Sequence, residues 1–362
     1  MSVTTSSGAT MATPSESDDE EVSLECLAIA RSEYDNPGIT KAAFDEQGDV
    51  SLLVGAPGAN DQAIYTVCSR TLSRASPLLD TLLRSSKADR QLDGGWIVRL
   101  PYDDPQSIRI ILNIVHGRFR DVPDSMALGS LHQLCISLDK YHIAECLGPW
   151  AKNWCQTARR LGPYAVRGHA QVAWVAYVLG NKSMLQEATQ ILLRETSPWE
   201  LVEGDEHLLP LYLAGILDNI KKQQIESLQS LVKLMHDTWS DCVANCSSGR
   251  GCLVSSDSER KVCTAAVAGS LTASLHKREL LPSSKPIPLE EYTLADFVDI
   301  ARNITGEIVQ GCNRWGADHR KCGPAEKVLK AIELAEESFV PILSMAQLER
   351  LKEQAERIGV EY

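Results

Sequence analysis

The feature of this sequence that most restricts its fold is a change in hydrophobic pattern at the Gly162-Pro163 pair. Before this pair, segments in which every second residue is apolar come between segments in which apolar residues recur every three or four positions. After it, only the second pattern remains. We therefore expect strands and helices together in the first part of the chain and helices alone in the rest, that is, an α+β domain followed by an all-α domain.

Three short segments have the composition and the alternation of strands. They cover residues 48–55, 63–69 and 96–100. The residues between the first two, 56–61, include proline, glycine, asparagine and aspartate, which are typical of turns. The first two segments are therefore predicted to form a hairpin.

Helix boundaries are marked by residues that favour helix ends. Asp104 is suited to an N-cap and is followed by proline, and Gly117 stands where a helix commonly ends, so the pattern predicts a helix between them. Residues 211–239 have the spacing of one long helix or of two joined helices. Pro324 opens a last helical stretch, which a kink at Pro341 is expected to divide.

The chain of 362 residues is long enough for two domains. Residues 1–40 are rich in serine, threonine and acidic residues, and we expect them to form a disordered tail because they carry too little apolar surface to pack. The α+β domain is then expected at 41–158 and the helical domain at 159–362. The tryptophans Trp150, Trp154, Trp174 and Trp199 are expected in the core or between the domains.

The formal net charge of −12 disfavours two classes of partner, nucleic acid and anionic membranes, because both need a basic surface. No secretory signal and no apolar segment of about 18 residues is visible in the sequence. An intracellular location in the cytoplasm, the nucleus or both is therefore expected. Cysteines are mostly reduced in such compartments.

Three segments of the N-terminal half, in order, resemble the BTB/POZ domain family. Residues 48–55 are similar to the opening strand of the family with its Asp-Val pair, and residues 65–79 to its second strand and first helix. Residues 96–154 include a leucine-rich helix that ends in Asp-Lys-Tyr, as in the family. The resemblance covers roughly residues 44–156 and is nearest to fungal proteins that are loosely labelled nuclear pore protein-like.

This resemblance implies a BTB/POZ fold for the α+β domain and a function without catalysis. The chain is expected to be a protein–protein interaction scaffold or adaptor that self-associates as a homodimer through this domain. Members of the family place the start of the first strand and the first helix at the interface. The expected interface residues are Asp49, Leu72, Ser76 and Leu79.

Two alternative roles follow from the same resemblance. Many BTB adaptors bind cullin-3 through a hydrophobic-x-Glu element, but none is evident between Leu83 and Trp96, where the nearest match is Leu92-Asp93-Gly94. A cullin-3 ubiquitin-ligase substrate adaptor is thus less favoured. Some BTB proteins act in transcription, but this chain has an acidic charge and no DNA-binding motif, so direct DNA contact is not expected.

No motif of the sequence indicates an enzyme. The nucleophile elbow, the P-loop, the dinucleotide fingerprint and the metalloprotease helix are all absent from it. We therefore predict no catalytic residues and no cofactor-binding residues. His132 and His142 flank Asp139, and both histidines are expected to be either exposed or hydrogen-bonded in a structural role.

The helical half contains a group of cysteines whose spacing matches no standard zinc finger. Three interpretations are open: a structural metal site, separate thiols, or disulfides. The metal interpretation proposes zinc held by Cys252, Cys263, His319 and Cys322, of which Cys263 is expected to open a helix. Cys246 and Cys312 are the expected substitutes. A metal-dependent enzyme built on the same residues, with Glu259 and Asp318 nearby, is the least favoured function.

Overall fold

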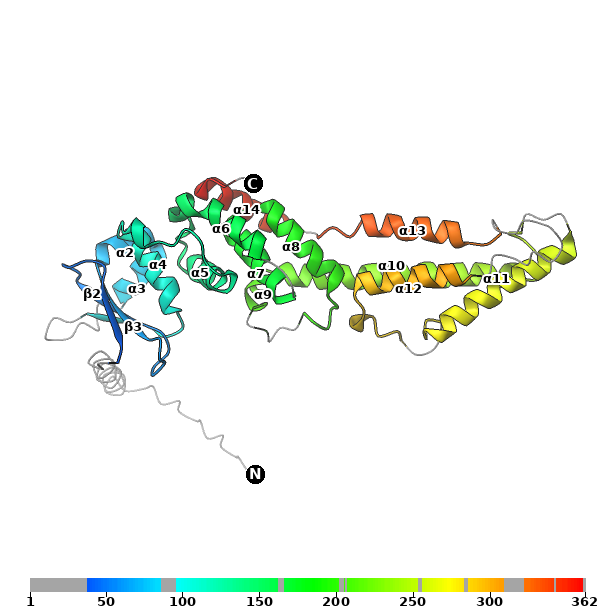
Figure 1. Cartoon of the computed structure of the whole chain (residues 1–362), viewed down its shortest axis with the longest axis horizontal. Helices are drawn as coiled ribbons and strands as arrows, with labels where there is room; N and C mark the ends of the chain where they lie inside the picture. Colours follow the sequence, from blue (N-terminus) through cyan, green and yellow to red (C-terminus); the bar gives the residue numbers. More distant parts are fainter. Residues whose placement is uncertain are drawn as a thin grey trace, which may run out of the picture. The chain divides into compact units, whose positions relative to one another are not determined.

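The computed structural model describes residues 38–85, 96–161, 166–201, 205, 207–252, 256–282, 286–308, 322–341 and 343–360 (Figure 1). The predicted tail at 1–40 therefore lies almost wholly outside the described residues. The segment in which a cullin-binding element was sought also lies largely outside them, and so do Cys312 and His319.

The chain forms two compact units. Unit 1 contains Met1–Asp124 and Gln133–Leu147, and unit 2 contains Ser125–His132 and Gly148–Tyr362. The chain passes between the units three times, and the last passage, after Leu147, lies before the boundary that we expected between residues 158 and 159. The reason is that helix α6 (Gly148–Leu161) packs on helices α7 (Val166–Val178) and α14 (Met345–Ile358).

Unit 1 contains a sheet of four strands in the order β1-β3-β2-β4. The strands are β1 (Thr40–Ala43), β2 (Val50–Val54), β3 (Ala63–Val67) and β4 (Ile97–Leu100). Strands β2 and β3 form the predicted antiparallel hairpin, with Leu52 opposite Tyr65. Strand β4 pairs with β2 in parallel, and β1 pairs with β3 in parallel. The third predicted strand is thus confirmed, whereas β1 was not predicted, because its four residues are mostly exposed and show no alternation.

Helices also form in the segments between and after these strands. They are α2 (Ser69–Ala75), α3 (Pro77–Ser85), α4 (Pro105–Val115), the short 3₁₀ helix η2 (Phe119–Asp121), α5 (Leu128–Tyr141) and the 3₁₀ helix η3 (Ala144–Leu147). The start of α4 confirms the expected cap, since the Asp104 carboxylate accepts a hydrogen bond of 2.7 Å from the backbone N–H of Ser107. Gly117, with φ +72°, follows the last helical residues as expected.

Polar bonds in the core of unit 1 join segments that are distant in sequence. The Ser76 hydroxyl donates a hydrogen bond of 2.6 Å to the carbonyl of Tyr141, which ends α5, and accepts one from the backbone N–H of Leu79. The Tyr141 hydroxyl and the Lys140 ammonium both donate to the buried carboxylate of Asp103. These contacts give Ser76, Lys140 and Tyr141 a structural role, because buried polar groups need such partners.

In the described residues of unit 2 all regular secondary structure is helical. Its helices are α6 and α7, α8 (Lys182–Glu195), α9 (Leu209–Leu213), α10 (Ile216–Asn245), α11 (Asp257–Lys277), the 3₁₀ helix η4 (Leu289–Glu291), α12 (Leu294–Glu307), α13 (Ala325–Glu337) and α14. Helix α7 is buried from Val172 to Val178 and packs on α6, α8, α9 and α14. Its end requires glycine: Gly180 has φ +76°, and a Cβ atom there would lie 2.4 Å from the backbone nitrogen of Ala355 in α14.

Three expectations for the helical half need correction. For residues 211–239 the alternative of two helices is confirmed, since Gly215, with φ +68°, separates α9 from α10, but α10 continues to Asn245, beyond the expected end. Helices α13 and α14 are separated by residues 338–344, which is a longer interruption than a kink at Pro341. Helix α11 begins at Asp257, so Cys263 lies within it and does not open it. Figure 1 shows α10, α12 and α13, which contact one another, running side by side.

Candidate functional site

The loop that follows α10 turns back onto the start of α11. Thr264 in α11 donates a hydrogen bond of 3.2 Å to the carbonyl of Cys246, the residue directly after α10. Gly249 has φ +66°, and a Cβ atom there would lie 2.9 Å from the Cβ of Arg260. Glycine allows both the backbone conformation and the close approach. The loop is thereby held against the first two turns of α11.

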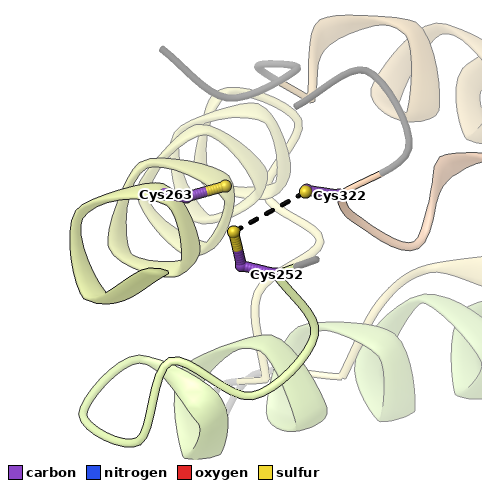
Figure 2. Close-up of side chains that lie close together, drawn as sticks. All are labelled: Cys252, Cys263 and Cys322. Atoms are coloured by element: carbon purple, nitrogen blue, oxygen red, sulfur yellow. Dashed lines mark hydrogen bonds between the residues drawn. The ribbon is translucent and has the colours of Figure 1, made fainter. Parts of the chain in front are cut away.

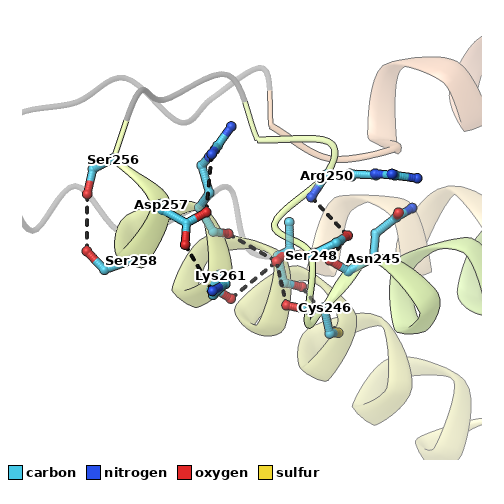
Figure 3. A network of polar contacts seen from close by, with 10 residues as sticks. Asn245, Cys246, Ser248, Arg250, Ser256, Asp257, Ser258 and Lys261 are labelled. Atoms are coloured by element: carbon cyan, nitrogen blue, oxygen red, sulfur yellow. Dashed lines mark hydrogen bonds and ion pairs between the residues drawn. The ribbon is translucent and has the colours of Figure 1, made fainter.

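Polar contacts stabilise the two ends of this loop (Figure 3). At the loop's start, the Ser248 hydroxyl donates to the carbonyl of Asn245 and accepts from the backbone N–H of Arg250. At the first turn of α11, Asp257 forms ion pairs with Arg260 and with Lys261, which is 2.9 Å away. Acidic side chains at a helix N-terminus are stabilised by the helix dipole. The start of the loop and the first turn of α11 are therefore each held by local polar contacts.

Three cysteine sulfurs meet where this loop, α11 and the residues before α13 come together (Figure 2). The Sγ atoms of Cys252, Cys263 and Cys322 all lie within 4.8 Å of one another. The distance between the sulfurs of Cys322 and Cys252 is 3.7 Å, much longer than a disulfide bond of about 2.05 Å. Cys263 and Cys322 are buried, and Cys252 is half-buried. The cluster can provide three sulfur ligands to one soft metal ion.

The structure thus brings together three of the four residues that the sequence suggested as zinc ligands. His319, the fourth, lies outside the described residues, as does the substitute Cys312, so their role stays a prediction. The other substitute, Cys246, is not in the cluster. Its thiol contacts backbone carbonyls instead, at 3.3 Å from the oxygen of Cys242 and 3.8 Å from that of Thr264.

Burial and mutual proximity both disfavour thiolates in this cluster when no cation is bound. The pKa of Cys263 is raised to about 12, first because burial removes the thiolate from water and then because Cys252 and Cys322 lie next to it. A divalent cation reverses this balance, since a coordinated thiol loses its proton. Cys263 is therefore suited either to the neutral thiol form or to a thiolate bound to a metal.

A cavity of about 520 Å³ adjoins the cluster. Its wall includes Cys263 and Cys322 together with four charged side chains, which are Asp237 and Asp241 of α10, Arg250 of the loop and Lys327 of α13. In a structural zinc site protein ligands fill all positions of the ion, whereas a catalytic site keeps one position open. The number of protein ligands around an ion bound here would therefore distinguish the two kinds of site.

The expected interface residues of unit 1 have different positions. Leu72, Ser76 and Leu79 are buried within the unit, with exposed fractions of 0%, 0% and 5%, so their side chains contribute to its core. Asp49 lies at the surface, where its carboxylate accepts hydrogen bonds of 2.7 Å from the backbone N–H and from the hydroxyl of Ser69, and so caps the start of α2. Whether this region forms an interface stays a prediction.

Asp49 also lines a surface pocket of about 580 Å³ in unit 1. Three arginines and a second aspartate share its wall; the complete lining is Asp49, Ser69, Arg70, Ser73, Arg74, Asp80, Leu83, Arg84 and Trp96. We call this set the α2–α3 pocket. The sequence analysis did not predict these arginines as site residues. Their spacing was a usable signal, because Arg70 and Arg74 are four residues apart and therefore share one face of α2.

Comparison with known proteins identifies no relative: no protein family model matches the sequence, and no curated protein matches it. Among the described residues, no helix combines the length and the apolar character that crossing a membrane would require.

Proposed function

We propose that this chain is a non-enzymatic interaction scaffold, whose unit 1 is a BTB/POZ-type domain that self-associates as a two-fold dimer. The observation that carries the proposal is the order of elements in unit 1. An antiparallel hairpin (β2 and β3) is followed by a helix pair (α2 and α3), then by a strand parallel to β2, and then by further helices. This is the order that the resemblance to the BTB/POZ family implies.

The α2–α3 pocket supports a self-associating surface. A two-fold interface brings a surface against its own copy, so a charged surface can bind itself only if it carries both signs. The pocket does so, with Arg70, Arg74 and Arg84 near Asp49 and Asp80. Next to it, the side of α3 that faces solvent includes Leu78, which is 41% exposed and adds apolar area to the surface.

The test is light scattering on the full chain over a range of micromolar concentrations. We expect a dimer, and we expect the double variant Arg70→Glu, Arg74→Glu to raise the dissociation constant at least tenfold, which corresponds to about 1.4 kcal/mol. Both arginines are exposed, so the exchange should leave the fold intact.

The matched control is the double variant Arg109→Glu, Arg120→Glu. Both residues are exposed on unit 1, and neither lines the α2–α3 pocket, so this variant changes the charge by the same amount at another place. It should dimerise like the wild type. A monomeric wild type at all concentrations would disprove self-association, and equal dissociation constants for the two double variants would exclude the pocket as the interface.

A further inference from the structure

We propose that Cys252, Cys263 and Cys322 bind one zinc ion, which has a structural role in unit 2. The ion would join the loop after α10, helix α11 and the segment that leads into α13. This inference concerns unit 2 alone and does not depend on the self-association proposed for unit 1.

The geometry of the sulfurs fits a tetrahedral ion. With zinc–sulfur bonds of about 2.3 Å and tetrahedral angles, the sulfurs of two ligands lie about 3.8 Å apart. The sulfurs of Cys322 and Cys252 are 3.7 Å apart, and all pairs in the cluster lie within 4.8 Å. Shifts of about an ångström would place all three at ligand distance. The three residues leave one position of the ion for a fourth donor.

The local backbone explains why such a cluster forms. Gly249 lets the loop lie against Arg260, and the hydrogen bond from Thr264 to the carbonyl of Cys246 holds the start of the loop against α11. Cys252 follows Gly249 by three residues and Cys263 is the neighbour of Thr264, so the two sulfurs come close together. Cys322 comes from a distant part of the sequence, 70 residues after Cys252.

The donor set selects the class of metal. Three sulfur ligands favour soft or borderline ions such as Zn²⁺ and disfavour Ca²⁺ and Mg²⁺, which prefer oxygen. On binding, each thiol releases its proton to solvent and no electron is transferred, so no oxidant is required. The bound ion joins residues 70 positions apart that come together only in the folded chain, so its binding free energy stabilises the folded state.

The test begins with metal analysis of the full chain, purified in a reducing buffer without added metal and without chelator. We expect about one zinc per chain. We also expect Co²⁺, exchanged for zinc, to show the intense visible bands of a tetrahedral site together with thiolate-to-cobalt charge transfer. The variants Cys252→Ser and Cys322→Ser should lose most of the metal.

Two neighbouring cysteines provide matched controls. Cys242 and Cys246 lie within the last turns of α10 or directly after them, close to the cluster in sequence but not part of it. Cys242→Ser and Cys246→Ser should retain one zinc per chain. Because Cys252 is only half-buried, Cys252→Ser is the cluster variant with the best prospect of folding normally.

A second measurement does not depend on any variant. In the wild-type protein, bound zinc should protect the three cluster thiols from alkylation, and a chelator should make them reactive, as located by peptide mass analysis. A wild type that contains no zinc would overturn the proposal. Retention of zinc in both cluster variants, or an intact mass two hydrogens lower because of a disulfide within the cluster, would overturn it as well.

Discussion

Replacement of Trp154 by alanine is expected to lower the free energy of unfolding of unit 2 by about 3–5 kcal/mol. Trp154 in α6 is 0% exposed, and its ring stacks on that of Trp150 at 6.3 Å between centroids. The alanine variant would lose this apolar burial and would leave a cavity that close-packed neighbours cannot fill. The corresponding fall in melting temperature is roughly 6–20 °C for a unit of this size.

The matched control is Trp199→Ala, which removes the same side chain from the surface. Trp199 is 70% exposed, and the hydrogen bond from its backbone N–H to the carbonyl of Glu290 does not involve the ring. We expect a change within about 0.5 kcal/mol. Urea unfolding of both variants, followed by circular dichroism, makes the comparison. Equal losses of stability would show that α6 does not pack into unit 2 as described.

The stability of unit 2 should also depend on pH through His132. This histidine is 1% exposed, and neither of its ring nitrogens has a hydrogen-bond partner among the described residues. Burial, and secondarily the nearby His207, lower the pKa of His132 to about 4 from its ordinary value near 6.5. The folded chain thus keeps the ring neutral at a pH where the unfolded chain binds a proton.

The direction of the effect follows from this difference in proton binding. Well above pH 6.5 neither state is protonated at His132, and this contribution to stability is at its full value. As the pH falls from 6.5 towards 4, the unfolded state gains a proton that the folded state does not, so the free energy of unfolding decreases. Between pH 7.5 and pH 4.5 this one group should account for about 2–3 kcal/mol of the loss.

The variant His132→Leu isolates this contribution. At pH 7.5 it should be as stable as the wild type or more stable, because it removes two buried polar atoms that lack partners. Urea unfolding at a series of pH values should then show a smaller loss towards pH 4.5 than in the wild type. His276→Leu, a change at an exposed position of α11, is the control and should follow the wild type. Parallel profiles for His132→Leu and the wild type would contradict the account.

Local sequence signals predicted much of the fold. The hairpin, the fourth strand and the capped start of α4 follow from alternation, turn residues and an N-cap aspartate, all of which act within a few residues. Strand β1 could not be predicted in this way, because it is held by its pairing with β3 and not by a buried face of its own. His132 was expected to be either exposed or satisfied and is neither, since its surroundings depend on tertiary packing.

Only part of the candidate metal site could be predicted from the sequence. A polar loop that contains Cys252, followed by Cys263, suggested a local pair of ligands. Nothing in the spacing of 70 residues between Cys252 and Cys322 specified that they meet, because that contact depends on how α10, α11 and α13 pack. Conversely, Leu72 and Leu79 were expected at an interface, but the structure buries both within unit 1.

Native mass spectrometry of the purified full chain at micromolar concentration tests self-association and zinc binding together, because one spectrum reports the number of subunits and the bound metal. We expect a species with twice the mass of the chain that carries two zinc ions, and a loss of both ions after acid denaturation. A species with the mass of one metal-free chain, at every concentration at which the protein is folded, would contradict both proposals.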